Sequence, residues 1–131
     1  MPVKLFYLEN GGILAKCKGI VTGSEIKEIN DELYETEEKI RKILYQIVDF
    51  TTVEKLLVSN DEIDMISLQD KKAFEINPGM LIAVVTDQDL IFGLARMWEA
   101  KTYDPSFDTR VFRKLEDARE WVNSKLHEPQ H

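Results

Sequence analysis

The segment Asp49-Phe50-Thr51-Thr52 places a carboxylate and two hydroxyl groups close together in the chain. It ends an apolar run typical of a buried strand, and open α/β sheets bind ligands at the carboxyl ends of their strands. A phosphate on Thr51 or Thr52 would add about two negative charges and three acceptor oxygens. Asp49, Thr51 and Thr52 are therefore candidate regulatory or ligand-binding residues. The alternative is that they cap a turn and bind otherwise free backbone amides.

A second candidate is Ser59, which is followed by Asn60, Asp61 and Glu62. The pattern predicts a helix N-terminus at Ser59, where unpaired amides and the helix dipole favour a phosphate. The alternative is a plain capping box, in which Ser59 and Glu62 bind each other's backbone amides. Asp61 and Glu62 would also compete with a phosphate at this position.

Aromatic residues form a third candidate, an apolar pocket beside a helix. A small-molecule pocket combines apolar walls with a few placed polar groups. Arg96 would then bind an anionic head group, and the walls would be Trp98, Tyr103, Phe107 and Phe112. The alternative is that these aromatic residues belong to the core or anchor loops.

The sequence gives no support for an enzyme. A response-regulator receiver places an aspartate, a serine or threonine, and a lysine at the ends of three strands, and the matching residues here would be Asp49, Thr86 and Lys114. The paired acidic residues that a receiver has after its first strand are missing, so Mg²⁺ would lack ligands. The two histidines, His127 and His131, lie at the C-terminal end, so no nucleophile–histidine–acid set is expected inside the domain. We therefore expect no catalytic residues, no metal site and no cofactor.

Composition limits the classes of partner and the location. The 131 residues include 24 acidic and 17 basic ones, giving a net charge of -7, which argues against nucleic acid and anionic membranes. Cys17 is the only cysteine, so no intrachain disulfide is possible and a reducing compartment is expected. No apolar run reaches the ~18 residues of a membrane span, and no signal peptide is evident. We expect a cytoplasmic protein.

Strands and capping boxes define the first half of the chain. Strands are predicted at Lys4–Leu8 and Ile13–Val21, joined by an Asn-Gly turn that favours a hairpin. Thr22 and Glu25 form a capping box that begins a helix, and residues 37–42 are expected to be its frayed end and the following turn. Ile43–Phe50 reads as a strand covered on both faces. Thr51–Leu57 is ambiguous between a loop and a short helical turn.

The second half alternates helices and strands. A helix beginning at Ser59 is expected to stop at Asn77-Pro78-Gly79. Met80–Val85 is the most apolar run and predicts a central strand. Asp87 or Thr86 would cap the next helix, whose buried face is Ile91, Leu94, Ala95 and Trp98. Asp108–Leu126 supplies the last strand and an amphipathic helix.

The predicted order is β-β-α-β-α-β-α-β-α. Parallel strands need crossover helices, so this order indicates an α/β fold with a five-stranded mixed, mostly parallel sheet and about four helices. The N-terminal hairpin supplies the antiparallel member. We expect a single domain over residues 1–126, followed by a flexible tail at residues 127–131.

The N-terminal hairpin, the segment Gly19–Glu25 that opens the first helix, and a third strand ending in Asp49 together resemble the SpoIIAA-like (STAS-type) domains. Val111–Val122 resembles the end of the SpoIIAA-like branch that is often described as STAS/SEC14 domain proteins. The resemblance spans nearly the whole chain and implies a SpoIIAA-like fold without catalysis.

Well-understood STAS members are anti-sigma factor antagonists. They bind a partner kinase and are switched by phosphorylation of a serine at the N-terminus of the helix after the third strand. Ser59 matches that serine in position, but the family's Asp-Ser-Ser-Gly motif is absent here. The resemblance therefore leaves the phosphorylation switch open.

These observations predict a non-catalytic regulatory or interaction domain that binds a protein partner or a small ligand. The alternative is a carrier or sensor of a lipid or another apolar small molecule. An exposed apolar patch would indicate a homodimer or another protein partner.

Overall fold

The computed structural model describes residues 2–128 and contains one five-stranded sheet with strand order β1-β2-β3-β4-β5. The strands are β1 (Val3–Tyr7), β2 (Gly12–Thr22), β3 (Tyr45–Leu57), β4 (Leu81–Val85) and β5 (Asp108–Phe112). The helices are α1 (Gly23–Leu33), α2 (Glu37–Arg41), α3 (Asn60–Ile76), α4 (Asp89–Lys101) and α5 (Leu115–Leu126).

Strand directions follow from the connections. β1 runs antiparallel to β2, while β2, β3, β4 and β5 are parallel neighbours. The tight turn between β1 and β2 places Gly11 at a φ of 86°, a conformation that glycine adopts without steric cost. The predicted fold, a mixed α/β sheet with an N-terminal antiparallel hairpin, is confirmed.

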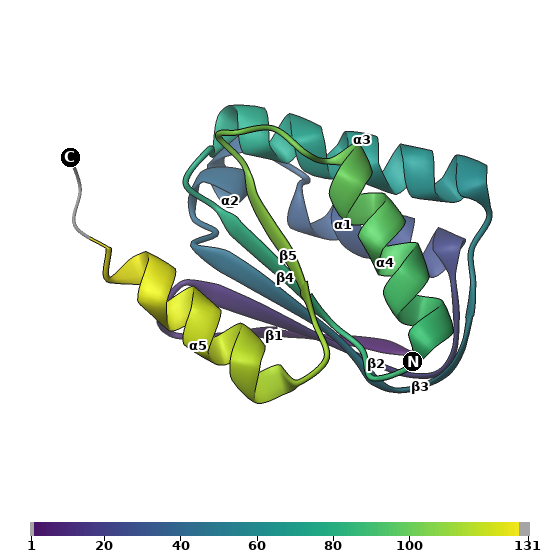
Figure 1. The fold of residues 1–131 in the computed structure, drawn as a ribbon. Helices are drawn as coiled ribbons and strands as arrows, with labels where there is room; N and C mark the ends of the chain where they lie inside the picture. The colour runs from purple at the N-terminus through teal and green to yellow at the C-terminus, as the bar shows by residue number, and fades with distance from the viewer. Residues whose placement is uncertain (1, 129–131) are drawn as a thin grey trace.

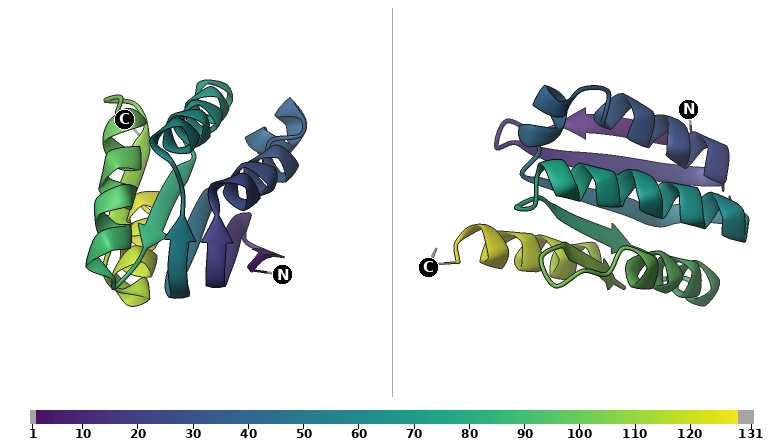
Figure 2. Two further views of the ribbon diagram at one scale, coloured as in Figure 1. Left: turned by 90° about the vertical axis from the view of Figure 1, so that its right-hand side faces the viewer. Right: turned by 90° about the horizontal axis from the view of Figure 1, so that it is seen from above.

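The helices divide unequally between the two faces of the sheet. Figures 1 and 2 show α1, α3 and α4 on one face and α5 on the other. Alternate residues of β3 serve the two faces: Phe50 belongs to the core beneath α1, α3 and α4, whereas Tyr45 and Ile47 belong to the core beneath α5. The sheet thus separates two apolar cores.

Two capping boxes begin helices on the three-helix face, as the sequence predicts. Thr22 Oγ1 accepts a hydrogen bond from the Glu25 amide at 3.2 Å, and the Glu25 carboxylate accepts one from the Thr22 amide at 2.9 Å. Ser59 and Glu62 repeat the arrangement at 3.1 and 2.9 Å. Asn77 then ends α3, and its side-chain amide donates to the carbonyl oxygens of residues 40 and 43.

Several predicted boundaries are wrong. Residues 37–42 do not fray from α1, because Thr36 caps a separate short helix, α2. Neither Thr86 nor Asp87 is the N-cap of α4: that residue is Gln88, whose amide donates to Thr86 Oγ1. His127 and Glu128 follow α5, and the remainder of the predicted tail, residues 129–131, lies outside the described residues.

The largest departure concerns Thr51–Leu57, which continues β3 instead of forming a loop or helical turn. The extension is possible because β2 is long enough to pair with it as far as Leu57. Two register shifts interrupt this pairing, and the apolar side chain of Val53 is buried within it. Asp49 therefore lies inside β3, where the pairing with β4 stops, and not at the end of the strand.

Between residues 2 and 128, no helix combines the length and apolar character needed to cross a bilayer.

Candidate functional site

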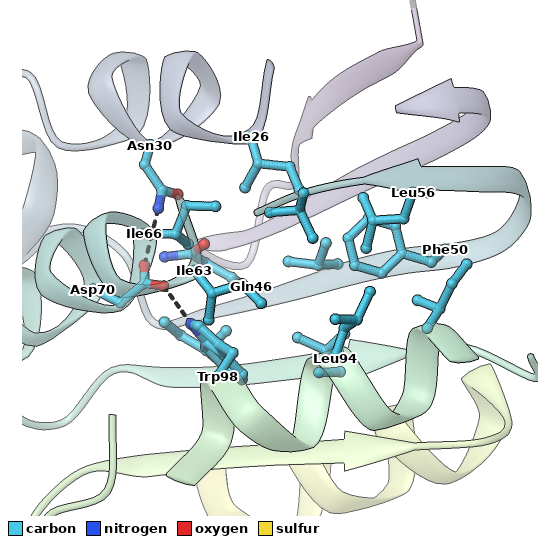
Figure 3. A pocket seen from close by; sticks show the side chains of 16 residues that line it. Ile26, Asn30, Gln46, Phe50, Leu56, Ile63, Ile66, Asp70, Leu94 and Trp98 are labelled. Carbon is cyan, nitrogen blue, oxygen red and sulfur yellow. Dashed lines mark hydrogen bonds between the residues drawn. The ribbon is translucent and has the colours of Figure 1, made fainter. Parts of the chain in front are cut away.

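A cavity of about 90 Å³ lies between the sheet and the layer formed by α1, α3 and α4 (Figure 3). One buried water needs roughly 10–15 Å³ of such space, so the cavity holds several waters or a slender apolar group. Its walls are mainly aliphatic and aromatic side chains from β3, β4 and the three helices, including Val48, Phe50, Ile66, Ile82, Val84 and Ile91.

The cavity has one polar end. Figure 3 shows Asn30, Gln46, Asp70 and Trp98 gathered at this end, with Phe50 and Leu56 at the other. Asn30, Gln46 and Asp70 are each less than 7% exposed, whereas Leu56 is only half-buried. The polar end is therefore closed to solvent, and the apolar end lies nearer the surface.

Asp70 is the centre of the polar end. Its Oδ1 accepts hydrogen bonds from Tyr34 Oη at 2.7 Å and from Asn30 Nδ2 at 3.3 Å. Its Oδ2 accepts one from Trp98 Nε1 at 2.8 Å. Gln46 Nε2 donates to Tyr34 Oη at 2.7 Å, so α1, α3, α4 and β3 are joined by one network.

Burial without a positive partner controls the acidity of this network. Loss of hydration raises the pKa of Asp70 from 3.8 to about 6, although hydrogen bonds from Tyr34, Trp98 and Asn30 oppose the rise. The pKa of Tyr34 is also raised, first by burial and then by the neighbouring Asp70 charge. Within residues 2–128, Asp70 forms no ion pair.

Leaving this space open carries an energetic penalty. A cavity destabilises a core by about 24 cal/mol per Å³, which corresponds to about 2 kcal/mol for a volume of 90 Å³. Larger side chains at Ala95 or Val84 would reduce the space. An unfilled apolar cavity with a built polar end is therefore a candidate binding site and not a simple packing gap.

Only one residue of the predicted aromatic pocket lines this cavity. Trp98 is buried and forms part of the wall. Arg96 points elsewhere and pairs with Glu99 at 3.0 Å, while Tyr103 is 73% exposed. Phe107 stacks on Phe74 with ring centroids 4.7 Å apart. Arg96, Tyr103 and Phe107 therefore do not line this cavity, and a pocket formed by this group stays a prediction.

Phe112 is also remote from the cavity. It packs in the core on the α5 face, where its ring lies 5.6 Å from that of Trp121. The alternative interpretation, that these aromatic residues serve the core and its loops, describes Phe107 and Phe112.

Asp49, Thr51 and Thr52 lie together, but not at the cavity. Asp49 Oδ1 accepts hydrogen bonds from Thr51 at its amide (2.8 Å) and its hydroxyl (2.6 Å), and Thr52 Oγ1 donates to the Cys17 carbonyl at 2.8 Å. This cluster coincides with the first register shift between β2 and β3. The three side chains thus stabilise an irregular strand pairing.

The polar residues at the closed end were not predicted from the sequence. A usable signal exists for Asp70: it falls on the buried stripe of α3 together with Ile63, Ile66, Ala73 and Phe74. A carboxylate on an apolar stripe needs buried hydrogen-bond donors. Asn30 and Gln46 gave no comparable signal, because their partners are remote in sequence.

Comparisons with known proteins agree with this architecture. The family model described as SpoIIAA-like matches residues 13–123. The chain belongs to the SpoIIAA-like family. No curated protein sequence matches this SpoIIAA-like chain.

Two solved structures are similar in fold. The unphosphorylated anti-sigma factor antagonist SpoIIAA aligns with 10% identity and a TM-score of 0.61, covering 92% of this chain and 97% of its own. The phosphorylated form of the Bacillus cell fate determinant SpoIIAA gives the same identity and TM-score, covering 92% and 98%. At this level of identity the likeness concerns the fold alone.

Ser59 of this SpoIIAA-like domain lies at the N-terminus of α3 and is exposed. The space beside its cap is already used, because the Glu62 carboxylate accepts from the Ser59 amide and lies against Gly23. A Cβ atom on Gly23 would approach the Glu62 carboxyl carbon to 2.6 Å. Glu62 thus occupies the position at which an anion would bind the start of α3.

The remaining candidate groups are potential metal ligands and the Cys17 thiol. Among residues 2–128 no group of three or more histidine, cysteine, aspartate or glutamate residues is arranged to hold a metal. Burial raises the pKa of the Cys17 thiol to about 12, which keeps it protonated and unreactive. What the site offers is an apolar cavity, open near Leu56, with buried hydrogen-bonding groups at its other end.

Proposed function

We propose that this SpoIIAA-like domain is a non-catalytic regulatory domain that binds an apolar small molecule in the cavity beneath α3. The cavity is the single observation that supports the proposal most directly. Its walls come from α1, α3, α4, β3 and β4, so a bound molecule would contact five elements at once. Occupancy would then change the free energy of holding the three helices on the sheet.

The energetics support a ligand of modest size. Filling the space with apolar atoms would recover the roughly 2 kcal/mol lost to the cavity, in addition to the gain from removing the ligand's own surface from water. A domain of this kind is a sensor when the ligand alters binding of a protein partner, and a carrier when it only holds the ligand.

The proposal includes a cytoplasmic location, which rests on the single buried cysteine.

Benzene provides the simplest test of the site, because it binds dry apolar cavities without needing a polar partner. We expect benzene to shift the methyl NMR signals of Ile66, Ile82 and Val84, and to raise the melting temperature with concentration. Ala95→Phe, which places a ring into the cavity from α4, should abolish both effects.

The matched control is Met97→Phe, which adds a ring on the exposed side of the same helix. It should bind benzene as the natural protein does. Equal binding by Ala95→Phe, or no benzene-dependent shift of the three methyl signals in the natural protein, would contradict the proposed site.

A protein partner is a second candidate, favoured by the open half of the α5 face. Alternation along β1 and β2 places Lys4, Lys16 and Lys18 on this face, all exposed, although the chain as a whole has a net charge of -7. Lys4 and Lys16 are direct cross-strand partners, a pairing of like charges that does not stabilise the sheet. The side chain of Phe6, beneath Lys4 Nζ, is 38% exposed.

This face suits a partner with an acidic segment and an apolar contact for Phe6. We expect Lys16→Glu to weaken capture of such a partner from a lysate, while Lys72→Glu, an exposed change on α3, leaves capture unchanged.

Light scattering of the purified protein would separately test the predicted homodimer. Regulation through Asp49, Thr51, Thr52 or Ser59 is part of this second candidate, and phosphate mapping after incubation with the partner kinase tests it.

A further inference from the structure

The hydrogen-bond donors at the closed end of the cavity are all in use. Both hydrogens of the Asn30 amide are directed to acceptors, Gln69 Oε1 and Asp70 Oδ1. The Gln46 amide nitrogen lies next to Tyr34 Oη and Met80 Sδ. Tyr34 Oη and Trp98 Nε1 each have one hydrogen, and both donate to Asp70.

The acceptors at the same end are not all in use. A carboxylate offers about four lone-pair directions, and Asp70 accepts three hydrogen bonds. Asn30 Oδ1 and Gln46 Oε1 accept none from residues 2–128. No side-chain nitrogen or oxygen in the described part is both sealed and unpartnered, so these two oxygens border space that a water-sized group can enter.

The orientation of both amides follows from their neighbours. The Tyr34 hydroxyl gives its only hydrogen to Asp70, so the group that Gln46 presents to Tyr34 Oη must be a donor. The group that Asn30 presents to the ionised Asp70 must also be a donor. The oxygens of Asn30 and Gln46 are therefore the atoms left without a partner.

We propose that the cavity selects an elongated amphiphile whose head donates hydrogen bonds and is not anionic, such as an alcohol or a primary amine. A primary ammonium head would donate one hydrogen each to Asn30 Oδ1, Gln46 Oε1 and Asp70 Oδ2, whereas an alcohol would donate its single hydrogen to one of these oxygens. In both cases the apolar tail would extend toward Leu56. This inference rests on the proposed function, to which it adds the chemical class of the ligand.

The polarity of the cavity fits such a molecule, whose tail would leave the 90 Å³ space at its open apolar end beside the half-buried Leu56. Gln46, Val48 and Phe50 alternate onto the same face of β3, and the span from Gln46 to Phe50 is about 13 Å at the usual strand rise. Apolar side chains line that span. A carboxylate or phosphate head would meet the Asp70 charge at low dielectric with no cation in the wall, which excludes fatty acids and phosphorylated lipids.

Three ligands of equal chain length test the head-group preference: 1-octanol, octylamine and octanoate, each titrated at pH 8. Trp98 fluorescence reports binding in a Trp121→Phe background, since the chain has two tryptophans and Trp121 lies on the other face. We expect octanol, octylamine or both to bind about tenfold or more tightly than octanoate, because one buried hydrogen bond is worth about that factor. Octanoate binding within threefold of both others overturns the inference.

Gln46→Met identifies the acceptor directly. Methionine is close to glutamine in length and volume but removes the whole amide, both the oxygen that would accept from the head group and the nitrogen that donates to Tyr34 Oη; unchanged benzene binding is the control for the second loss. We expect this variant to lose about tenfold in affinity for the preferred octyl ligand while binding benzene as before. An unchanged octyl affinity in Gln46→Met would show that the head does not bind at this end and would overturn the inference.

The two proposals fail in different ways. If benzene does not bind, the cavity is not a ligand site and the proposed function fails. If benzene binds and is blocked by Ala95→Phe, but the octyl series shows no preference, the proposed function stands and only the inferred ligand class fails.

Discussion

The two faces of the sheet are packed by different means. On one face a single helix, α5, seals the sheet through small side chains: Ala83, Val85 and Ala118 are completely buried. On the other face three helices cover the sheet and leave a cavity between them. The two cores use alternate side chains of the same strands, β3 and β4. Only the three-helix face contains a buried polar network, in which Asp70 joins α1, α3 and α4 beside the cavity.

The contrast indicates a division of roles. The core beneath α5 is tightly packed, so small changes of side-chain volume there are expected to reduce the free energy of unfolding. The three-helix face is closely packed at one end, where Phe74 stacks on Phe107, and open in the middle. Substitutions that empty, ionise or fill particular positions on each face test this division.

The largest expected effect is at the packed end of the three-helix face. Phe74 is completely buried, and its ring lies nearly parallel to that of Phe107 at 4.7 Å. We expect Phe74→Ala to reduce the free energy of unfolding by about 3–5 kcal/mol, because a large aromatic cavity replaces the ring. Urea denaturation followed by circular dichroism measures the change.

The matched control for Phe74 is Phe6→Ala on the edge strand β1, where the ring is 38% exposed. It should cost less than about 1 kcal/mol. Similar losses for the two variants would show that α3 is loosely held along its whole length, and the contrast between its packed end and its open middle would not stand.

Asp70 makes the three-helix face sensitive to pH. Its pKa is raised from 3.8 to about 6 in the folded protein, first by burial, so the folded state binds more protons than the unfolded state between these values. Stability from this residue is therefore highest below about pH 4 and is lost as the pH rises through about 6. The shift corresponds to about 3 kcal/mol.

The Asp70→Asn variant isolates this contribution, since other carboxylates titrate in both proteins. We expect the unfolding free energy of the natural protein minus that of the variant to fall by about 2 kcal/mol between pH 4 and pH 7. Urea titrations at four pH values measure it. A difference that stays constant, or rises with pH, would show that Asp70 is not buried without a positive partner.

An alanine on each face permits a direct comparison of packing. Ala118 on α5 is completely buried, whereas Ala95 on α4 borders the cavity. We expect Ala118→Leu to destabilise the protein by about 1–3 kcal/mol through overpacking. Ala95→Leu should leave the stability unchanged or raise it, because the added methyl groups enter existing space. Thermal denaturation of both variants gives the comparison, and an equal loss in both would mean that the cavity is not available to side chains.

Local sequence signals account for most of the fold. Asn10-Gly11 and the two capping boxes are short-range devices, and the structure contains the hairpin and both helix starts that they predict. The extension of β3 beyond Thr51 was not predictable in this way, because it depends on pairing with the long strand β2, which is remote in sequence.

The residues of the site are also brought together by contacts that are remote in sequence. Trp98 was identified from its type, but Asn30, Gln46 and Asp70 come from three elements and acquire a common role only after folding.

The smallest expected effect concerns the start of α3, the helix that covers the cavity. Ser59→Ala removes the hydroxyl that accepts from the Glu62 amide, which should cost about 1 kcal/mol. Ser59→Asp keeps an N-cap acceptor and should lose less, and Ser124→Ala, on the exposed side of α5, should change stability by less than about 0.5 kcal/mol. If Ser59→Ala is as stable as Ser124→Ala in urea denaturation, the cap does not fix α3. The free energy that holds this helix over the cavity would then come from the Asp70 network and from the buried apolar side chains of α3, Phe74 among them.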